Sequence, residues 1–221
     1  MTARQIELVL FDLDGTLADT APDLAAAANR QRVQRGLEPL PVEQLRPMAS
    51  QGARGLVGLA LGLAPGDADY EAARLEFLAF YEQALCVHTQ LFAGMAETLE
   101  RLEAQDRRWG VVTNKASRFT EPLMELLGLR RRAACVVSGD TTPHAKPHPA
   151  PILHALDACA VGSARAIYVG DDRRDVQAGR AAGVTTIVAA YGYLGEDADV
   201  VSWGGDYVIE TPLQLLTWIG V

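Results

Sequence analysis

Two aspartates stand where a predicted β-strand ends. The segment LVLFDLDGT, residues 8–16, passes from an apolar run directly into Asp12 and Asp14 and then into Gly15. Because side chains alternate along an extended chain, Asp12 and Asp14 can face the same side, and Gly15 allows a sharp turn after them. Two carboxylates held together resist joint ionisation unless a cation is present. The pair therefore predicts a cation beside the end of this strand.

Polar groups also follow three further strand candidates, namely Thr113 and Asn114, Ser138 and Asp140, and Asp171 and Asp172. The carboxyl ends of parallel strands meet at one edge of a sheet, so these groups are expected to gather there. A single aspartate at a strand end is more often a helix N-cap, but that explanation does not account for the whole set. Asp171 would complete an all-oxygen site, which suits magnesium with retained water and a substrate phosphate better than zinc.

Short β-type runs alternate with helical stretches outside residues 20–90, which is the pattern of a parallel sheet covered by helices on both faces. The strand candidates are nearly continuously apolar, as expected for strands that are buried on both sides. We therefore predict an α/β fold with a Rossmann-like, doubly wound parallel sheet. The five stronger candidates are IELVLFD, RWGVVTN, ACVVSGD, AIYVGDD and TTIVAAYG, and DYVIE is a weaker sixth.

Residues 20–90 contain no convincing strand and are predicted to be helical. The segment TAPDLAAAANRQRVQRGL has Thr20 as a capping residue, an early Pro22 and a stop at Gly36. The segment DADYEAARLEFLAFYEQAL has one apolar face. We predict a helical cap domain over residues 20–89, inserted into an α/β core of residues 1–19 and 90–221. This arrangement would put the cap beside the carboxyl ends of the strands, where open α/β sheets bind ligands.

The chain has 221 residues and a formal net charge of −8, from 20 Lys and Arg against 28 Asp and Glu. This charge argues against a general affinity for nucleic acid or anionic membranes. No segment reaches the roughly 20 apolar residues of a membrane span, and there is no signal-peptide pattern, so a cytoplasmic location is expected. The three cysteines, Cys86, Cys135 and Cys159, fit neither a disulfide framework nor a CxxC site.

Four short motifs together resemble those of the haloacid dehalogenase superfamily, in order and in spacing. They are DLDGT at residues 12–16, TN at 113–114, KP at 146–147 and GDDRRD at 170–175. The resemblance covers nearly the whole chain, including the helical insertion after the first motif, and is closest to the phosphoglycolate phosphatase-like branch. It implies a magnesium-dependent phosphatase, as a monomer or homodimer, that acts on a small phosphorylated metabolite. The expected substrate is 2-phosphoglycolate.

The resemblance also implies a role for each matching residue. Asp12 would attack phosphorus and form an aspartyl-phosphate, and Asp14 would protonate the leaving alkoxide and then deprotonate the attacking water. Mg²⁺ would be held by Asp12, Asp171 and the backbone carbonyl of Asp14. The remaining implied site residues are Thr113 and Asn114 for the phosphate oxygens, Lys146 for the transition-state charge and the phosphate, and Asp172 or Asp175 as a supporting carboxylate.

Two further segments have competing interpretations. In SQGARGLVGLALG, Arg54 could bind a substrate carboxylate beside two glycines, or it could be a surface arginine next to glycines that pack helices. In PHAKPHP, His144 and His148 have the spacing of a helical metal pair, but the three prolines exclude that helix. We predict instead a loop that presents Lys146.

Other functions remain open beside the leading one. Close relatives with the same motifs include sugar-phosphate phosphatases, such as N-acetylmuramic acid 6-phosphate phosphatase, and pyrophosphatase is a further option. Phosphosugar mutases of the superfamily often have DGV where this chain has Asp14, Gly15 and Thr16, so a mutase is less expected than a phosphatase. Haloacid dehalogenases typically lack the second aspartate, so Asp14 argues against hydrolysis of a carbon–halogen bond. A non-enzymatic phosphate-binding regulator would be expected to lack one of the central residues, yet all are present: Asp12, Asp14, Lys146 and Asp171.

Overall fold

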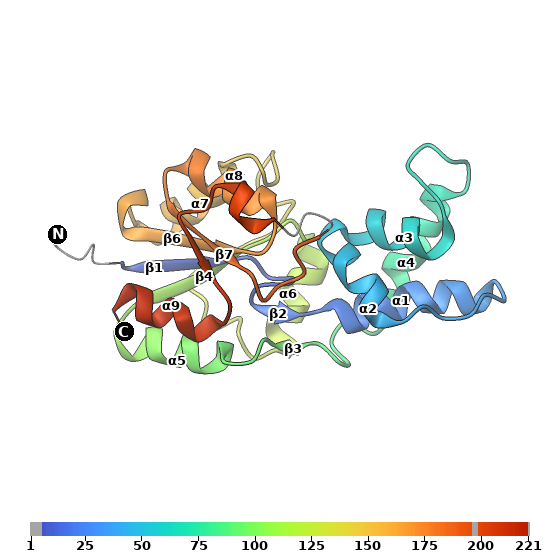
Figure 1. Cartoon of the computed structure of the whole chain (residues 1–221), viewed down its shortest axis with the longest axis horizontal. Coiled ribbons are helices and arrows are strands. Elements are labelled where there is room, and N and C mark those ends of the chain that lie inside the picture. Colours follow the sequence, from blue (N-terminus) through green and yellow to red (C-terminus); the bar gives the residue numbers. More distant parts are fainter. Residues whose placement is uncertain (1–5, 196–198, 221) are drawn as a thin grey trace.

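The central sheet consists of six parallel strands in the order β5-β4-β1-β6-β7-β8 (Figure 1). The structure is a computed structural model that describes residues 6–195 and 199–220, so residues 1–5, 196–198 and 221 of the predicted core lie outside the described residues. All six strand candidates form strands. They are β1 Leu8–Phe11, β4 Arg108–Val112, β5 Val136–Val137, β6 Ala166–Gly170, β7 Thr185–Ala189 and β8 Tyr207–Ile209.

The strand order reverses at β1, which has β4 on one side and β6 on the other. The register puts Phe11, the last residue of β1, level with Val111 and Val169. The segments that follow these three strands therefore emerge together at the carboxyl edge of the sheet. The predicted doubly wound parallel sheet is confirmed, and a reversal of this kind is where such sheets bind ligands.

Helices cover both faces of the sheet because alternate side chains of each strand point to opposite sides. Val9 and Phe11 pack in an apolar cluster with residues of α5, α6 and α9, whereas Leu8 and Leu10 pack in a second cluster with residues of α7 and α8. Figure 1 shows α5 and α9 below the sheet and α7 and α8 above it. The helices of this core are α5 Met95–Ala104, α6 Ser117–Leu126, α7 Ala150–Cys159, α8 Arg173–Ala182 and α9 Pro212–Ile219, with 3-10 turns at Ser163–Arg165 and Val200–Trp203.

The chain between β2 and β3 forms a group of helices, called the cap here, at the end of the molecule opposite the N-terminus (Figure 1). On α4 the predicted apolar face is buried, with Tyr70, Phe77 and Tyr81 inside. Arg30 of α1 lies 4.0 Å above the ring of Phe80 on the outer side of this helix. The cap helices are α1 Ala21–Gln34, α2 Val42–Leu45, α3 Gly52–Leu61 and α4 Tyr70–Gln83, with a 3-10 segment at Arg46–Gln51.

Two short antiparallel strands, β2 Ala18–Asp19 and β3 Gln90–Leu91, join the cap to the core (Figure 1). The sequence did not indicate them, because two residues are too few for a period-two pattern to be visible. They bring the two chain connections of the cap side by side. The two covalent connections between cap and core therefore lie together.

Thr20 precedes α1 as predicted, but the prediction that its side chain caps the helix is wrong. The phenolic oxygen of Tyr193 accepts instead from the backbone N–H groups of Thr20 at 2.7 Å and Ala21 at 2.8 Å. The Thr20 hydroxyl is turned toward Asp14 and donates to its Oδ1 at 2.5 Å. The phenol of Tyr193 thus accepts from N–H groups at the start of α1, and the hydroxyl of Thr20 remains available to donate to Asp14.

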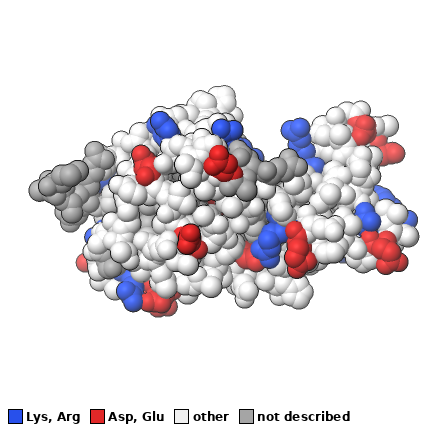
Figure 2. Space-filling view, viewed as in Figure 1, with Lys and Arg blue, Asp and Glu red and all other residues white. Residues whose placement is uncertain are grey.

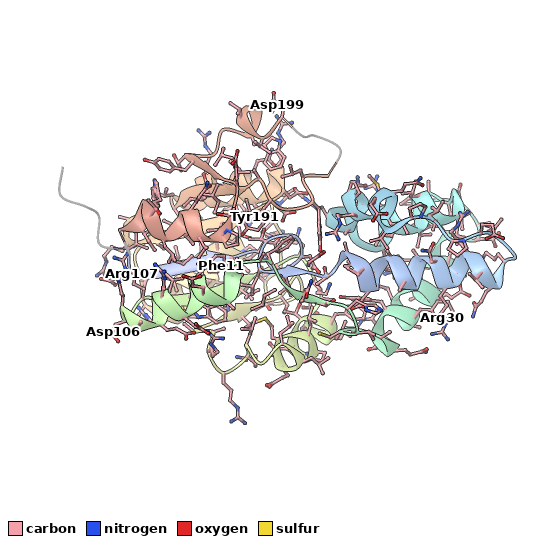
Figure 3. The ribbon with its side chains drawn as sticks, turned by 60° about the horizontal axis from the view of Figure 1, so that its bottom comes forward. Phe11, Arg30, Asp106, Arg107, Tyr191 and Asp199 are labelled. Atoms are coloured by element: carbon pink, nitrogen blue, oxygen red, sulfur yellow. The ribbon has the colours of Figure 1, made fainter. Side chains whose placement is uncertain are left out.

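Charged side chains of both signs are scattered over the face shown in Figure 2, and the coloured residues of that face form no basic patch. Figure 3 shows Phe11 and Tyr191 in the interior of the core and Arg30 in the cap, far from both. Among the described helices, none combines the length and the apolar character needed to cross a bilayer.

Candidate active site

Three buried aspartates meet at the carboxyl edge of the sheet. Asp12 follows β1, Asp171 follows β6, and Asp175 lies in the first turn of α8. One carboxylate oxygen from each lies within 4.8 Å of the others. Gly15 makes this approach possible, because its φ is +83° and a Cβ there would lie 2.2 Å from Asp171 Oδ2. Both backbone conformation and space therefore require glycine at this turn.

Lys146 places its ammonium group among these carboxylates. Its Nζ lies 2.9 Å from Asp12 Oδ1 and 2.7 Å from Asp175 Oδ1, with only 2% of the side chain exposed. It also donates to the hydroxyl of Tyr168 at 2.7 Å. Residues 143–149 form a non-helical loop around it, as predicted. The loop thus delivers a fixed positive charge to Asp12 and Asp175.

Negative charge exceeds positive charge in this cluster. Burial, together with the charges of Asp175 and Asp14, raises the pKa of Asp12 to about 7 against the opposing effect of Lys146. Burial, and then Asp12 and Asp175, also raise the pKa of Asp171 well above its ordinary value. Three carboxylates face one ammonium, and the donors are all oxygen, which is the set that Mg²⁺ prefers. The residues present therefore fit a divalent cation. Asp12 and Asp171 are the pair that could hold it, because both oxygens of Asp175 are engaged, Oδ1 by Lys146 and Oδ2 by the backbone N–H of Asp172, whereas Lys146 and Leu13 both contact Asp12 at Oδ1.

Asp172 and Asp175 occupy different positions in this arrangement. They form a reciprocal capping box at the start of α8, in which Asp172 Oδ1 accepts from Arg174 N at 2.8 Å and Asp175 Oδ2 accepts from Asp172 N at 3.1 Å. Arg174 pairs with Asp172 and also donates to the backbone oxygen of Ser50 in the cap at 2.5 Å. Asp175 thus contacts Lys146 directly, whereas Asp172 positions an arginine that links the core to the cap.

Asn114 and Thr113 both line the space in front of Asp12. The amide of Asn114 holds the lysine loop, because Nδ2 donates to the backbone oxygen of Lys146 at 2.9 Å and Oδ1 accepts from its backbone N–H at 2.9 Å. Thr113 Oγ1 accepts from the backbone N–H of Lys115 at 3.2 Å, which leaves the hydroxyl proton for another partner. The side chain of Asn114 is therefore engaged, while the hydroxyl of Thr113 can still donate.

Lys115 belongs to the site although the sequence motifs did not indicate it. Its Nζ lies 2.8 Å from Asp14 Oδ1, with 8% of the side chain exposed, and 4.7 Å from the ring centroid of Tyr81 in the cap. Burial opposes the charge of Lys115, but Asp14 and Tyr81 outweigh it and raise the pKa of the ammonium. The available signal was a lysine directly after the polar end of β4. Two further residues outside the motifs are Tyr193, whose backbone N–H donates to Asp171, and Thr20, which donates to Asp14. Thr16, the last residue of the first motif, also donates to Asp171, a role that the sequence analysis did not assign to it.

A cavity of about 410 Å³ lies between this edge of the core and the cap. Arg54 does not line it; this exposed arginine borders a separate surface hollow with Met48 and Leu59. The structure therefore does not bring Arg54 to the other predicted site residues. The described arginines that line the cavity are Arg74, Arg118 and Arg174, and the core residues include Asp12, Asp14, Thr113, Asn114, Lys146, Asp172 and Asp175.

Comparisons with known proteins agree with this geometry. The family model for haloacid dehalogenase-like hydrolases matches residues 9–189. The chain is 42% identical over 211 residues to an N-acetylmuramic acid 6-phosphate phosphatase of Pseudomonas putida, with 96% of this chain and 95% of the relative covered. It is 43% identical over 207 residues to a phosphoglycolate phosphatase of Xanthomonas campestris pv. campestris, with 94% and 93% covered.

Solved structures show the same fold over the same length. A crystal structure of a predicted phosphoglycolate phosphatase from Haemophilus somnus superposes with a TM-score of 0.85 at 26% identity, covering 97% of this chain and 98% of that one. The resemblance seen in the four motifs is thus confirmed along nearly the whole chain. This protein belongs to the haloacid dehalogenase-like hydrolase family, in its phosphoglycolate phosphatase-like branch.

Proposed function

We propose that this phosphoric monoester hydrolase cleaves a small phosphate ester through an aspartyl-phosphate on Asp12. The observation that carries the proposal is the position of Asp12, which faces a cavity with its Oδ1 held by Lys146 at 2.9 Å and by the backbone N–H of Leu13 at 2.7 Å. Two donors on one oxygen orient the carboxylate before substrate arrives. Preorganisation of this kind lowers the barrier for attack.

In the first step an oxygen of Asp12 attacks phosphorus, and the bond from phosphorus to the ester oxygen breaks. Asp14 gives its proton to the leaving alkoxide. In the second step Asp14 takes a proton from water, which attacks phosphorus and releases phosphate and the free carboxylate of Asp12. The hydroxyl of Thr113 and the backbone N–H at Asn114 donate to phosphate oxygens, and Lys146 stabilises their charge. Bound Mg²⁺ at Asp12, Asp171 and the Asp14 carbonyl would supply the charge that offsets repulsion between carboxylate and phosphate.

Two substrates are candidates, and each carries a carboxylate. 2-Phosphoglycolate is the leading one, because the branch and the Xanthomonas relative at 43% identity point to it. N-acetylmuramic acid 6-phosphate is favoured by a different observation, the cavity of about 410 Å³, which falls within the size range of sites for ligands larger than a two-carbon acid. Its walls also offer apolar contacts for a sugar ring, from Leu24, Phe77, Leu78, Tyr81 and Phe119.

The substrate assignment predicts a clear preference in a phosphate-release assay. One of these two acids should be cleaved at least about 10-fold more efficiently, by kcat/KM, than hexose 6-phosphates or pyrophosphate, because a site that pairs a substrate charge rejects analogues without it. The measurement is phosphate release from this panel with Mg²⁺ present. Release from none of the esters would contradict the proposed function, and release from pyrophosphate alone would replace it.

Lys115→Met is predicted to impair the enzyme selectively when the leaving group is poor. The ammonium group holds Asp14 at 2.8 Å, so its removal should misplace the proton donor and lower kcat for alkyl phosphates by about 10- to 100-fold. An ester such as p-nitrophenyl phosphate needs little proton donation and should lose far less. Asp14→Asn should show the same dependence on leaving group. An equal loss for both classes of ester would contradict a role for Lys115 in positioning Asp14.

A further inference from the structure

The cations around the cavity differ in whether a carboxylate of the protein already neutralises them. Lys146 pairs with Asp12 and Asp175, and Lys115 pairs with Asp14. These lysines belong to the phosphoryl-transfer site at the sheet edge. The arginines therefore decide what the remainder of the cavity can bind.

Two of the three arginines are engaged by both arms of a carboxylate. Arg74 donates to Glu71 from Nε at 2.8 Å and from a terminal nitrogen at 2.6 Å. Arg174 donates to Asp172 in the same way, at 2.8 Å and 2.7 Å. A guanidinium held by a carboxylate in this fork geometry has little capacity left for a second anion.

Arg118 is the exception among the described residues that line the cavity, because it has no carboxylate partner. Its guanidinium carbon lies 4.4 Å above the ring centroid of Phe119, which leaves the planar edge of the group open to a ligand. It lies in the first turn of α6, three residues after Lys115. An unpaired arginine thus shares the cavity with the nucleophile and stands close in sequence to the residue that holds Asp14.

Hydroxyl groups without partners lie in the same cavity. The buried hydroxyl of Ser50 has no hydrogen-bond partner among the described residues, and the buried hydroxyl of Tyr81, which faces the ammonium of Lys115, has no described acceptor for its proton; both residues line the cavity. Tyr81 also packs against Phe119, with ring centroids 5.6 Å apart, so it stands beside the ring on which Arg118 rests. Buried polar groups without partners carry a free-energy cost, which a polar ligand would remove.

We propose that Arg118 binds the carboxylate of the substrate, with the Tyr81 hydroxyl as a further donor, so that the enzyme selects phosphate esters that carry an acid group. This inference rests on the proposed phosphatase function and adds the specificity-determining residue. In this proposal Arg118 of the core binds the substrate carboxylate, a role that the sequence had suggested for Arg54 of the cap. Both candidate substrates satisfy it, because each joins a carboxylate to the phosphate ester.

Matched pairs of substrates test the proposal whichever of the two acids is the natural substrate. N-acetylmuramic acid 6-phosphate is compared with N-acetylglucosamine 6-phosphate, which lacks only the lactyl group, and 2-phosphoglycolate is compared with 2-hydroxyethyl phosphate. The quantity measured is the ratio of kcat/KM for the acid to kcat/KM for its neutral partner. Arg118→Gln should lower this ratio about 10- to 100-fold for the natural pair, the range expected for loss of a charge-assisted hydrogen bond.

Two further variants sharpen the result. Arg118→Lys should retain part of the ratio because the charge remains while the fork geometry is lost. Arg54→Gln, an equal change of charge outside the cavity, should leave the ratio as it is in the unaltered enzyme. Turnover of neutral esters by Arg118→Gln serves as the check that this variant folds.

The outcomes separate the two proposals. An unchanged ratio in Arg118→Gln, or a loss in Arg54→Gln instead, would overturn the role of Arg118 while the phosphatase activity stands. An equal slowing of acid and neutral esters by Arg118→Gln would overturn that role as well. Failure of the unaltered enzyme to cleave any ester would instead refute the proposed function itself.

Discussion

Asp12→Asn is expected to reduce phosphate release by about 10⁴-fold or more, because an amide cannot form the aspartyl-phosphate. The change preserves size and leaves Lys146 in place, so binding of substrate should survive. The measurement is kcat with the best ester of the panel, together with trapping of the phosphorylated enzyme, which only the unaltered chain should show. Turnover within about 100-fold of the unaltered enzyme would contradict a covalent role for Asp12.

The same substitution is expected to stabilise the protein in the absence of metal. The pKa of Asp12 is raised to about 7 in the folded state, chiefly by burial, from an ordinary value of 3.8. The folded state therefore binds this proton more tightly than the unfolded state, and stability falls as pH rises between these two values. The amide introduced by Asp12→Asn cannot ionise, so the gain in melting temperature over the unaltered chain should be larger at pH 8 than at pH 5, measured with chelator.

Asp140→Asn is the matched control for this experiment. Asp140 follows β5, does not line the cavity, and accepts from the backbone N–H and the hydroxyl of Ser117, each at 2.9 Å. Hydrogen bonds from Ser117 lower the pKa of this carboxyl, so its ionised form favours folding above its ordinary titration range. Its replacement should lower the melting temperature slightly and leave kcat almost unchanged. A gain in stability from both substitutions would show that the effect at Asp12 is not due to the buried charge.

Removal of Mg²⁺ is expected to have the second large effect, on both activity and thermal stability. Chelator should reduce activity below about 1% of that with Mg²⁺, because the single charge of Lys146, which Asp12 and Asp175 share, would not offset the charge of Asp12 and Asp171 against the phosphate. Mg²⁺ at about 100 times its dissociation constant should also raise the melting temperature by about 5–10 °C, from a stabilisation of about 2.7 kcal/mol. This thermal readout is independent of catalysis.

Asp171→Asn distinguishes metal binding from general screening of charge. It removes a carboxylate that is 1% exposed and that has no cation partner among the described residues. The rise in melting temperature with Mg²⁺ should disappear in this variant and persist in Asp140→Asn. A rise of the same size in Asp171→Asn, or with KCl at equal ionic strength, would contradict a metal site at this position.

Local sequence patterns were sufficient to predict the strands of the sheet and the polar residues that follow them. Strands that are buried on both faces must be apolar, and charged residues can follow only where the strand leaves the sheet, so the sequence shows both the strands and the groups at their ends. The strand ends that carry Asp12, Thr113 and Asp171 are visible in this way. The four motifs then indicated the family, which the comparisons confirm.

Which side chains meet across the cavity was decided only by the tertiary structure. Lys115 reaches Asp14 across 101 residues of sequence, and Thr20 turns toward the same carboxylate because Tyr193 satisfies the start of α1. The sequence alone does not show which of Arg54 and Arg118 lines the cavity. Both are exposed, but Arg118 on α6 lines the cavity that contains Asp12, whereas Arg54 on α3 borders a separate surface hollow. Sequence determined the chemistry available at the sheet edge, whereas packing of the cap against the core decided which charges are already paired and which remain for a ligand.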